Sequence, residues 1–301
     1  MTTYIIPTST AEHIARNLVG KEDFEVVFTE GNKEGKRRFP DGEVYTRIPR
    51  IDEIEGRAVV LHSRVLDPNA EIIELETILD VLQSSETDKK RINAEVFFTY
   101  FSYGKQDLPF QKGESNIALD IVNRIMTYYF VDTMYTIDAH FVGRRWTNDF
   151  NIINTTAANL LQDSANADYP EENILYIGPD AGSRRRSGLR SFNKVRMNSY
   201  LTKIQGDKEL REAVRGRIVG VVDDIIETGG TMAGCYDVCM GYGAKEVIAL
   251  ATHGVLESGI RRVKEKFSKL YLSNTIDRPE ANVDVTGIVA STIKYERAIT
   301  D

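Results

Sequence analysis

The residues best suited to chemistry lie in one run, Val221–Thr231, where an apolar stretch ends in the adjacent carboxylates Asp223 and Asp224. A turn of small residues follows and opens a predicted helix. Backbone N–H groups and hydroxyls of Thr228–Thr231 can wrap a phosphate, because glycine permits the close approach and backbone angles of such a nest. The carboxylates can accept hydrogen bonds from sugar hydroxyls or hold hydrated Mg²⁺. A surface turn with a capping threonine is the alternative, but adjacent acids after an apolar strand are costly without a ligand.

Two other segments carry groups that could bind a nucleotide. Phe39 offers a stacking face, and Asp41 and Glu43 can accept hydrogen bonds from an exocyclic amine, although the same residues could form only a hairpin turn. The segment Tyr100–Asp107 follows an apolar run and contains Lys105, a point charge suited to a phosphate. The alternative interpretation of this segment is a solvated charged loop.

Two strand ends supply possible metal ligands. Thr136–His140 ends in a histidine, and Ile177–Gly182 contains Asp180. An imidazole and a carboxylate with open water positions are plausible partners of Mg²⁺. A lone histidine at a strand end is more often structural, so His140 depends on the other segments for its assignment.

Strands must position these groups, because short β-branched and aromatic runs alternate with helical periodicity along the chain. Near-continuous apolar strands in such an alternation are typical of parallel sheets with helices on both faces, where ligands bind beyond the carboxyl ends of strands. The predicted strands are Tyr4–Ile6, Ala58–Ser63, Glu95–Ser102, Met134–Asp138, Ile174–Ile177, Ile218–Asp224, Glu246–His253 and Leu270–Ser273.

Helices and a domain boundary are also indicated. Ile260–Phe267 is amphipathic, and Ser9 with Glu12 predicts a capping box at the first helix. The polar stretch Arg144–Asn154 is the best candidate for a boundary, which we place near Asn148.

The composition is that of a globular protein that binds neither nucleic acid nor membrane. The 301 residues carry a net charge of −7, whereas nucleic-acid binders usually show a basic surplus. The start lacks a signal-peptide pattern and no long apolar run occurs, so we expect a cytoplasmic protein. Cys235 and Cys239 are spaced for one helix face without companion metal ligands, which favours two buried thiols over a redox pair.

With Ala251–Val255 and Ser273–Ile276 added, these segments resemble, in order, the motifs of the ribose-phosphate diphosphokinase (PRPP synthetase) family from Tyr4 to Thr275. The Val221–Thr231 run is similar to the phosphoribosyl-binding motif that this family shares with type I phosphoribosyltransferases. The resemblance implies an α/β protein of two phosphoribosyltransferase-like domains, each a mainly parallel sheet flanked by helices. It implies an ATP-side domain over 1–148 and a ribose-phosphate-binding domain over 149–301, with the last helix able to pack back on the first domain.

The resemblance also implies an activity. The anomeric hydroxyl of ribose 5-phosphate attacks the β-phosphorus of Mg-ATP, giving PRPP and AMP for nucleotide biosynthesis. The implied ATP contacts are Phe39, Asp41, Glu43, Lys105, Gln106 and Asp107. The implied Mg²⁺ ligands, which are also catalytic, are His140 and Asp180. The implied ribose-phosphate contacts are Asp223, Asp224, Glu227, Thr228, Gly229, Gly230 and Thr231. The family's Phe39 segment closes over the adenine of a neighbouring subunit, which implies a homo-oligomer, either a dimer or a hexamer.

The chain departs from the family in its cations. Lys105 stands where arginine is usual, and a lysine lacks the bidentate fork. A gap-free count places the family's catalytic lysine at Lys203 and puts Gln205 in place of its arginine. A gapped alternative uses Lys194 with Arg196, but it deletes a helix from the domain, so we prefer Lys203 and expect Lys194 on the preceding helix.

The acceptor stays open. Arg184, Arg185 and Arg186 are more cations than the family usually shows, and they suit either a solvated face or a larger anionic acceptor such as ADP-ribose. A weakly active regulatory PRPP synthetase-like subunit is a second alternative, favoured by Gln205 and Lys105. A phosphoribosyltransferase is the third, disfavoured by the adenine segment and by two full domains.

Overall fold

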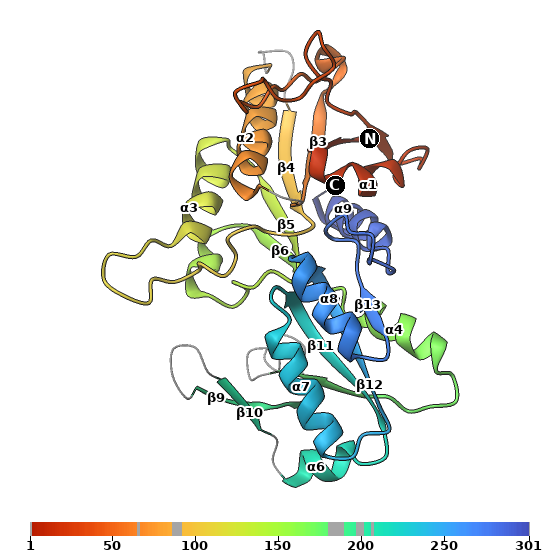
Figure 1. The fold of residues 1–301 in the computed structure, drawn as a ribbon. Coiled ribbons are helices and arrows are strands. Elements are labelled where there is room, and N and C mark those ends of the chain that lie inside the picture. The colour runs from red at the N-terminus through yellow and green to blue at the C-terminus, as the bar shows by residue number, and fades with distance from the viewer. Residues whose placement is uncertain are drawn as a thin grey trace. The chain divides into compact units, whose positions relative to one another are not determined.

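The computed structural model describes residues 2–64, 67–85, 92–179, 190–196, 202–205 and 208–300. The chain forms two compact units (Figure 1). Unit 1 comprises Met1–Thr155, Thr275–Asp277 and Thr286–Asp301, and unit 2 comprises Thr156–Asn274 and Arg278–Val285. The chain thus leaves unit 1 after Thr155 rather than near Asn148, because its strand β6 pairs with β5 in the sheet of unit 1.

A six-stranded parallel sheet in the order β2-β1-β3-β4-β5-β6 forms the centre of unit 1. Its strands are β1 (Thr3–Pro7), β2 (Phe24–Val26), β3 (Gly56–His62), β4 (Ile92–Phe98), β5 (Thr133–Ile137) and β6 (Ile152–Thr155). Parallel neighbours need crossover connections, and helices supply most of them here. Every strand therefore has its carboxyl end at the same edge of the sheet.

Helices cover both faces of this sheet (Figure 1). They are α1 (Glu12–Arg16), α2 (Pro68–Ser84), α3 (Ile117–Asn123), which continues into the π-helix η3 (Arg124–Tyr128), and α9 (Thr286–Thr300). The 3₁₀ turns η1 (Ser9–Ala11), η2 (Ile51–Glu53) and η4 (Arg145–Asp149) complete the unit. Apolar side chains of α2 and α3 pack with alternate strand residues such as Val60 and Val96. On the opposite face, Arg57 donates through Nη1 to the Ile293 carbonyl of α9 at 2.8 Å.

Unit 2 is built on a five-stranded parallel sheet in the order β13-β12-β11-β7-β8, with a separate antiparallel pair, β9 and β10. Its strands are β7 (Leu175–Gly178), β8 (Arg190–Ser191), β9 (Asn193–Arg196), β10 (Thr202–Gln205), β11 (Ile218–Ile226), β12 (Glu246–Gly254) and β13 (Leu270–Leu272). Its helices are α4 (Ala158–Asp168), α6 (Lys208–Val214), α7 (Gly230–Gly241) and α8 (Glu257–Lys266).

Alternation along β11 gives unit 2 a core on each face of its sheet. Val219 and Val221 pack in the cluster that contains apolar residues of α6, α7 and α8. Ile218 and Val222 pack instead with Leu161 of α4. Successive strand residues point to opposite faces, so a run of apolar residues is required where both faces are covered.

The expected fold class, two mainly parallel sheets flanked by helices, is confirmed. Each predicted strand is present, although β4 ends at Phe98 rather than at Ser102, and the amphipathic stretch is α8. Cys235 and Cys239 are buried free thiols on α7, as expected. None of the helices described above is both long and apolar enough to cross a membrane.

The predicted capping box at Ser9 is wrong. No side chain caps η1 or α1, and Ser9 turns to α2, donating from its backbone N–H and its hydroxyl to the Glu74 carboxylate at 2.7 and 2.6 Å. Glu12 instead accepts from Arg16 at 2.8 Å. A nearly buried glutamate needs hydrogen-bond donors, and Glu74 takes from Ser9 the groups that a local cap would have used.

Candidate active site

The predicted phosphate loop, Glu227–Thr231, joins β11 to α7 at the carboxyl end of the sheet in unit 2. Because β11 extends to Ile226, Asp223 and Asp224 lie within the strand and are half-buried. The backbone N–H of Asp224 donates to Oδ1 of Asp223 at 3.0 Å. The carboxylates therefore stand on a rigid element next to a turn whose Glu227 and Thr228 side chains are exposed.

Gly229 begins the helix that follows this loop. It is the N-cap residue of α7 and has a φ of 72°, in the left-handed region that glycine adopts without strain. The first backbone N–H groups of any α-helix have no acceptor within the helix, and the helix dipole is positive at this end. The structure thus gives the loop the local geometry of an anion site.

In unit 1, Asp107 joins the loops that follow β4 and β5. Its side chain is 1% exposed, and Arg144 donates to it from Nε at 2.8 Å and from Nη2 at 3.1 Å. Trp146 donates from Nε1 to the Asp107 carbonyl at 3.1 Å, and His140 Nδ1 lies 3.6 Å from Asp107 Oδ2. The Asp107 carboxylate is therefore directed at protein groups. Sequence reasoning missed Arg144 and Trp146, because they lie in the stretch interpreted as a domain boundary.

The two loops at this cluster contain left-handed residues that are not glycine. Tyr103 has a φ of 64° and Asp138 a φ of 43°. Such conformations cost of order 1–3 kcal/mol and are concentrated at functional sites. A Cβ added at Gly104 would lie 3.8 Å from His140 Cβ, so the loop after β4 packs directly on the residue predicted to bind metal. Lys105 and Gln106, the predicted ATP contacts beside it, are exposed.

The predicted adenine segment is a hairpin tip with its functional groups exposed. The backbone N–H of Phe39 donates to the Glu43 carbonyl at 2.8 Å, and that of Glu43 donates to Asp41 Oδ1 at 3.1 Å. Phe39 is 41% exposed and meets Tyr45 edge to face, with 5.8 Å between ring centroids. The hairpin interpretation is thus realised, and it leaves one face of Phe39 and both carboxylates accessible.

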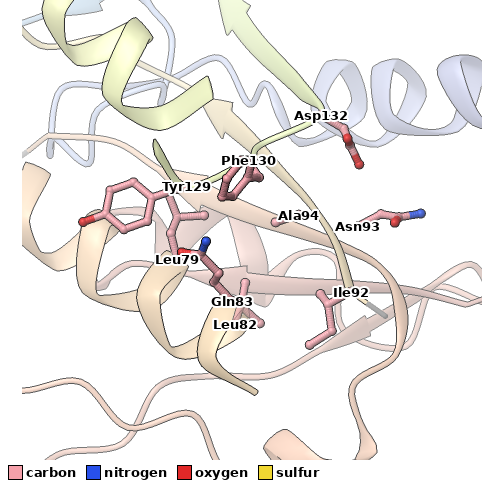
Figure 2. A pocket seen from close by; sticks show the side chains of 9 residues that line it. All are labelled: Leu79, Leu82, Gln83, Ile92, Asn93, Ala94, Tyr129, Phe130 and Asp132. Carbon is pink, nitrogen blue, oxygen red and sulfur yellow. The ribbon is translucent and has the colours of Figure 1, made fainter. Parts of the chain in front are cut away.

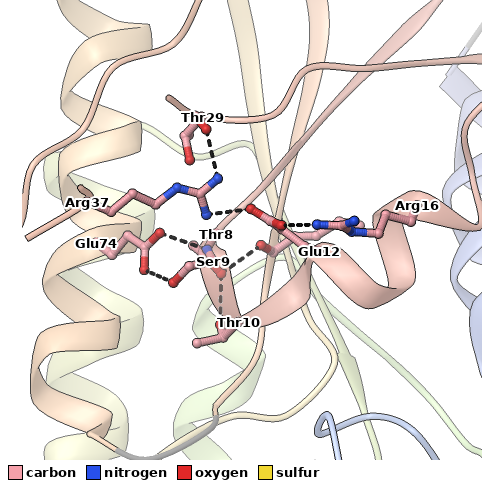
Figure 3. A network of polar contacts seen from close by, with 9 residues as sticks. Thr8, Ser9, Thr10, Glu12, Arg16, Thr29, Arg37 and Glu74 are labelled. Atoms are coloured by element: carbon pink, nitrogen blue, oxygen red, sulfur yellow. Dashed lines mark hydrogen bonds and ion pairs between the residues drawn. The ribbon is translucent and has the colours of Figure 1, made fainter. Parts of the chain in front are cut away.

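An ion network holds the base of this hairpin (Figure 3). Arg37 pairs with Glu12 of α1 and donates through Nη2 to the Thr29 carbonyl at 2.8 Å. Burial raises the pKa of Glu12, but hydrogen bonds from Arg16 and Arg37 outweigh it and keep that pKa below the usual value. Sequence reasoning missed this network, since no local motif links Glu12 to Arg37.

A cavity in unit 1 is lined by none of the predicted contact residues (Figure 2). Its volume is about 500 Å³, and its walls are the amino-terminal end of β4, the last turns of α2 and the chain around Phe130. The predicted contacts Lys105, Gln106, Asp107 and His140 follow β4 and β5 at their opposite, carboxyl ends, whereas the Phe39 segment follows β2. Size alone therefore does not mark the reactive site in this unit.

The remaining predicted site residues lie between β7 and β10 or in these strands. Asp180, Arg184, Arg185 and Arg186 are outside the described residues. The predicted helix at Lys194 is wrong, because Lys194 and Arg196 belong to β9, which pairs with β10 so that Lys194 is opposite Ile204 and Val195 opposite Lys203.

Within the described ranges, no three or more His, Cys, Asp or Glu side chains are grouped in a way that could hold a metal ion. His140 is 30% exposed, and its partner Asp107 is already engaged by Arg144. The half-buried pair Asp223 and Asp224 offers oxygen ligands, which Mg²⁺ prefers. These groups suit a cation that completes its shell with water and substrate oxygens.

The chain is similar to known proteins over most of its length. It is 30% identical over 266 residues to the ribose-phosphate pyrophosphokinase of Pyrococcus abyssi, covering 84% of this chain and 87% of the relative. It is 29% identical over 300 residues to that of Methanopyrus kandleri, covering 96% and 98%. The crystal structure of phosphoribosylpyrophosphate synthetase from Mycobacterium smegmatis matches with a TM-score of 0.78 at 22% identity, covering 98% of both chains. No family model matches the sequence.

Proposed function

Because this chain belongs to the ribose-phosphate pyrophosphokinase family, we propose that it transfers the diphosphoryl group of Mg-ATP to the anomeric hydroxyl of ribose 5-phosphate. The observation that carries the proposal is the extent of the relationship, which covers 84% of this chain and therefore residues of both units. The products are PRPP and AMP, as expected for a cytoplasmic enzyme of nucleotide biosynthesis.

Unit 2 binds the acceptor in this proposal. The phosphate of the sugar is held by N–H groups and hydroxyls of Thr228–Thr231, at the positive end of α7. Asp223 and Asp224 accept hydrogen bonds from the ribose hydroxyls. Support comes from the left-handed Gly229 and from the placement of both carboxylates in the last part of β11.

Unit 1 binds ATP. The exposed Lys105 and Gln106 reach the phosphates of ATP bound by their own chain. The exposed Phe39 stacks on the adenine bound by a neighbouring subunit, with Asp41 and Glu43 as acceptors. We assign Asp107 a positioning role, because its carboxylate is buried and bound by Arg144. Through these contacts it orients the side chains of Arg144 and His140.

His140 and Asp180 would hold the Mg²⁺ that accompanies ATP, and the ion would supply positive charge to neutralise the triphosphate. The new bond joins the anomeric oxygen to the β-phosphorus. The bond from that phosphorus to the bridging oxygen of AMP breaks, its electron pair leaves with AMP, and the hydroxyl proton is released. In-line positioning and neutralisation of oxygen charge supply the rate, with Lys203, or Lys194 and Arg196, as the cationic clamp.

The test measures AMP release from ATP with ribose 5-phosphate and, separately, with ADP-ribose. We expect AMP and PRPP, in equal amounts by ³¹P NMR, only with the first acceptor. AMP release with ADP-ribose alone would replace the acceptor. An absence of AMP release with either would favour a regulatory subunit. PRPP consumption with a purine base would instead indicate a phosphoribosyltransferase.

A further inference from the structure

We propose that Gly259 and Arg262 of α8 are positioning residues for phosphate binding, because they fix the orientation of the loop Glu227–Thr231 from behind. This inference rests on the proposed role of that loop. It assigns a task to a helix whose residues carry no sequence motif for ligand binding.

Gly259 allows α8 to contact the loop backbone. A Cβ at residue 259 would lie 1.9 Å from the Glu227 carbonyl oxygen and 3.0 Å from the Thr228 carbonyl carbon. A Cβ at residue 229 would lie 2.7 Å from the Gly259 carbonyl oxygen. Real Cβ atoms do not approach backbone this closely, so the two segments can meet only while both positions are glycine.

Arg262 holds the next peptide of the loop. Its Nη1 donates to the Thr228 carbonyl oxygen at 2.8 Å. The guanidinium is one helical turn beyond Gly259, so the same face of α8 meets two successive carbonyl groups, those of Glu227 and Thr228.

The orientation of the carbonyls sets the direction of the N–H groups. In a trans peptide the C=O and N–H bonds are antiparallel, and the described part of the chain contains no cis peptide. With the Glu227 and Thr228 carbonyls turned toward α8, the N–H groups of Thr228 and Gly229 point away from it. Two successive N–H groups on one side form the concave anion nest that a phosphate requires.

The charge of Arg262 acts through the same contact. A cation that binds the carbonyl end of a peptide increases the polarisation of its N–H end, which strengthens a hydrogen bond to an anion. The arginine thus supports phosphate binding through the Thr228 carbonyl, which it binds directly. Its side chain is exposed, so its loss should leave the core of unit 2 unchanged.

The experiment compares Arg262→Met with Arg261→Met, which removes the same charge from the neighbouring exposed position of α8. Titration calorimetry measures Kd for inorganic phosphate and for ribose 5-phosphate at low salt and at about 0.5 M salt. We expect Arg262→Met to weaken both ligands roughly tenfold, as for the loss of one charge-assisted hydrogen bond. The ratio should persist at high salt, where the field of a distant charge is screened. Arg261→Met should stay within about twofold of wild type, and KM for ATP should not change.

Gly259→Ala tests the close approach, with Gly241→Ala as its control, since a Cβ at residue 241 meets nothing within 4 Å. An alanine Cβ at residue 259 would force the loop backbone away from α8, so we expect a larger loss of phosphate binding than for Arg262→Met. Gly241→Ala should bind as wild type does. If Gly259→Ala does not fold, the comparison of the two arginines still decides.

Equal phosphate affinities in Arg262→Met and Arg261→Met overturn this inference, even if the enzyme releases AMP normally. A loss that disappears at high salt also overturns it, because it would reflect charge alone. If wild type binds phosphate but releases no AMP with any acceptor, the proposed function fails, whereas a tenfold loss in Arg262→Met still supports the positioning role. A wild-type chain that binds no phosphate overturns both.

Discussion

At the scale of single residues, His62 at the carboxyl end of β3 is a titratable group held in an apolar setting. Its side chain is fully buried, and neither ring nitrogen has a hydrogen-bond partner among the described residues. It meets Phe98 edge to face, with 5.2 Å between ring centroids. Burial removes water from the ring and lowers the pKa of His62 from 6.5 to about 3.

This pKa predicts an acid sensitivity of folding. Below pH 6.5 the unfolded chain binds a proton at His62 and the folded chain does not. Above pH 6.5 the residue therefore leaves the free energy of unfolding unchanged. As the pH falls from 6.5 toward 3, it lowers that free energy progressively. Each pH unit in that window costs about 1.4 kcal/mol for one proton. Urea unfolding between about pH 5 and 6.5, where few carboxylates titrate, should show this slope in wild type and a shallower one in His62→Met. Equal slopes in the two proteins would contradict the assignment.

The catalytic lysine is also a question of single residues. One charged donor that acts in the transition state is worth about 3 to 4 kcal/mol, which is on the order of a hundredfold to a thousandfold in rate. The gap-free count predicts that Lys203→Ala loses kcat by this factor with nearly unchanged ATP affinity, while Lys194→Ala is mild. Placement of Lys194 and Arg196 in β9, paired with β10, makes the reverse ranking a real competitor. Steady-state kinetics of the two variants decides the alignment.

At the scale of elements, the hairpin that carries Phe39 should depend on its anchor at Arg37. Arg37→Met removes the pair with Glu12 and the bond to the Thr29 carbonyl, so the hairpin gains freedom that ATP binding must then remove. We expect KM for ATP to rise about tenfold, with KM for ribose 5-phosphate unchanged. Lys36→Met is the control, because Lys36 pairs only at the surface with Glu34. Similar ATP affinities in both variants would mean that Arg37 does not hold the segment.

The elements also show what the sequence could predict. The strands and the phosphate loop were predictable, because apolar runs and a turn with two glycines are local patterns. The contacts of Asp107 with Arg144 and of Ser9 with Glu74 join residues 37 and 65 positions apart, and no local pattern encodes them. The helix predicted at Lys194 is wrong because β9 has only four residues, too few to show the period of a helix or of a strand. β2 and β8 were missed because they span 3 and 2 residues.

At the scale of the whole molecule, the family relationship is established by a relative that the chain matches at 30% identity across 84% of its length. This confirms the assignment made from motif order. The order of the motifs was informative about the family, because a chance resemblance would have to reproduce several independent segments in the same order along the chain.

The assembly of the molecule gives a last prediction. Phe39, Asp41 and Glu43 are exposed on a hairpin tip, and the family resemblance implies that this segment serves a neighbouring subunit. If so, Phe39→Ala and Asp224→Asn damage the same reaction from different chains. A mixed oligomer then contains sites with an intact Asp224 that receive an intact Phe39 from their neighbour. Each variant alone should be nearly inactive, and co-refolding or co-expression of the two should restore AMP release. Light scattering should show at least a dimer. An active monomer, or mixed oligomers without restored activity, would place Phe39 in the site of its own chain.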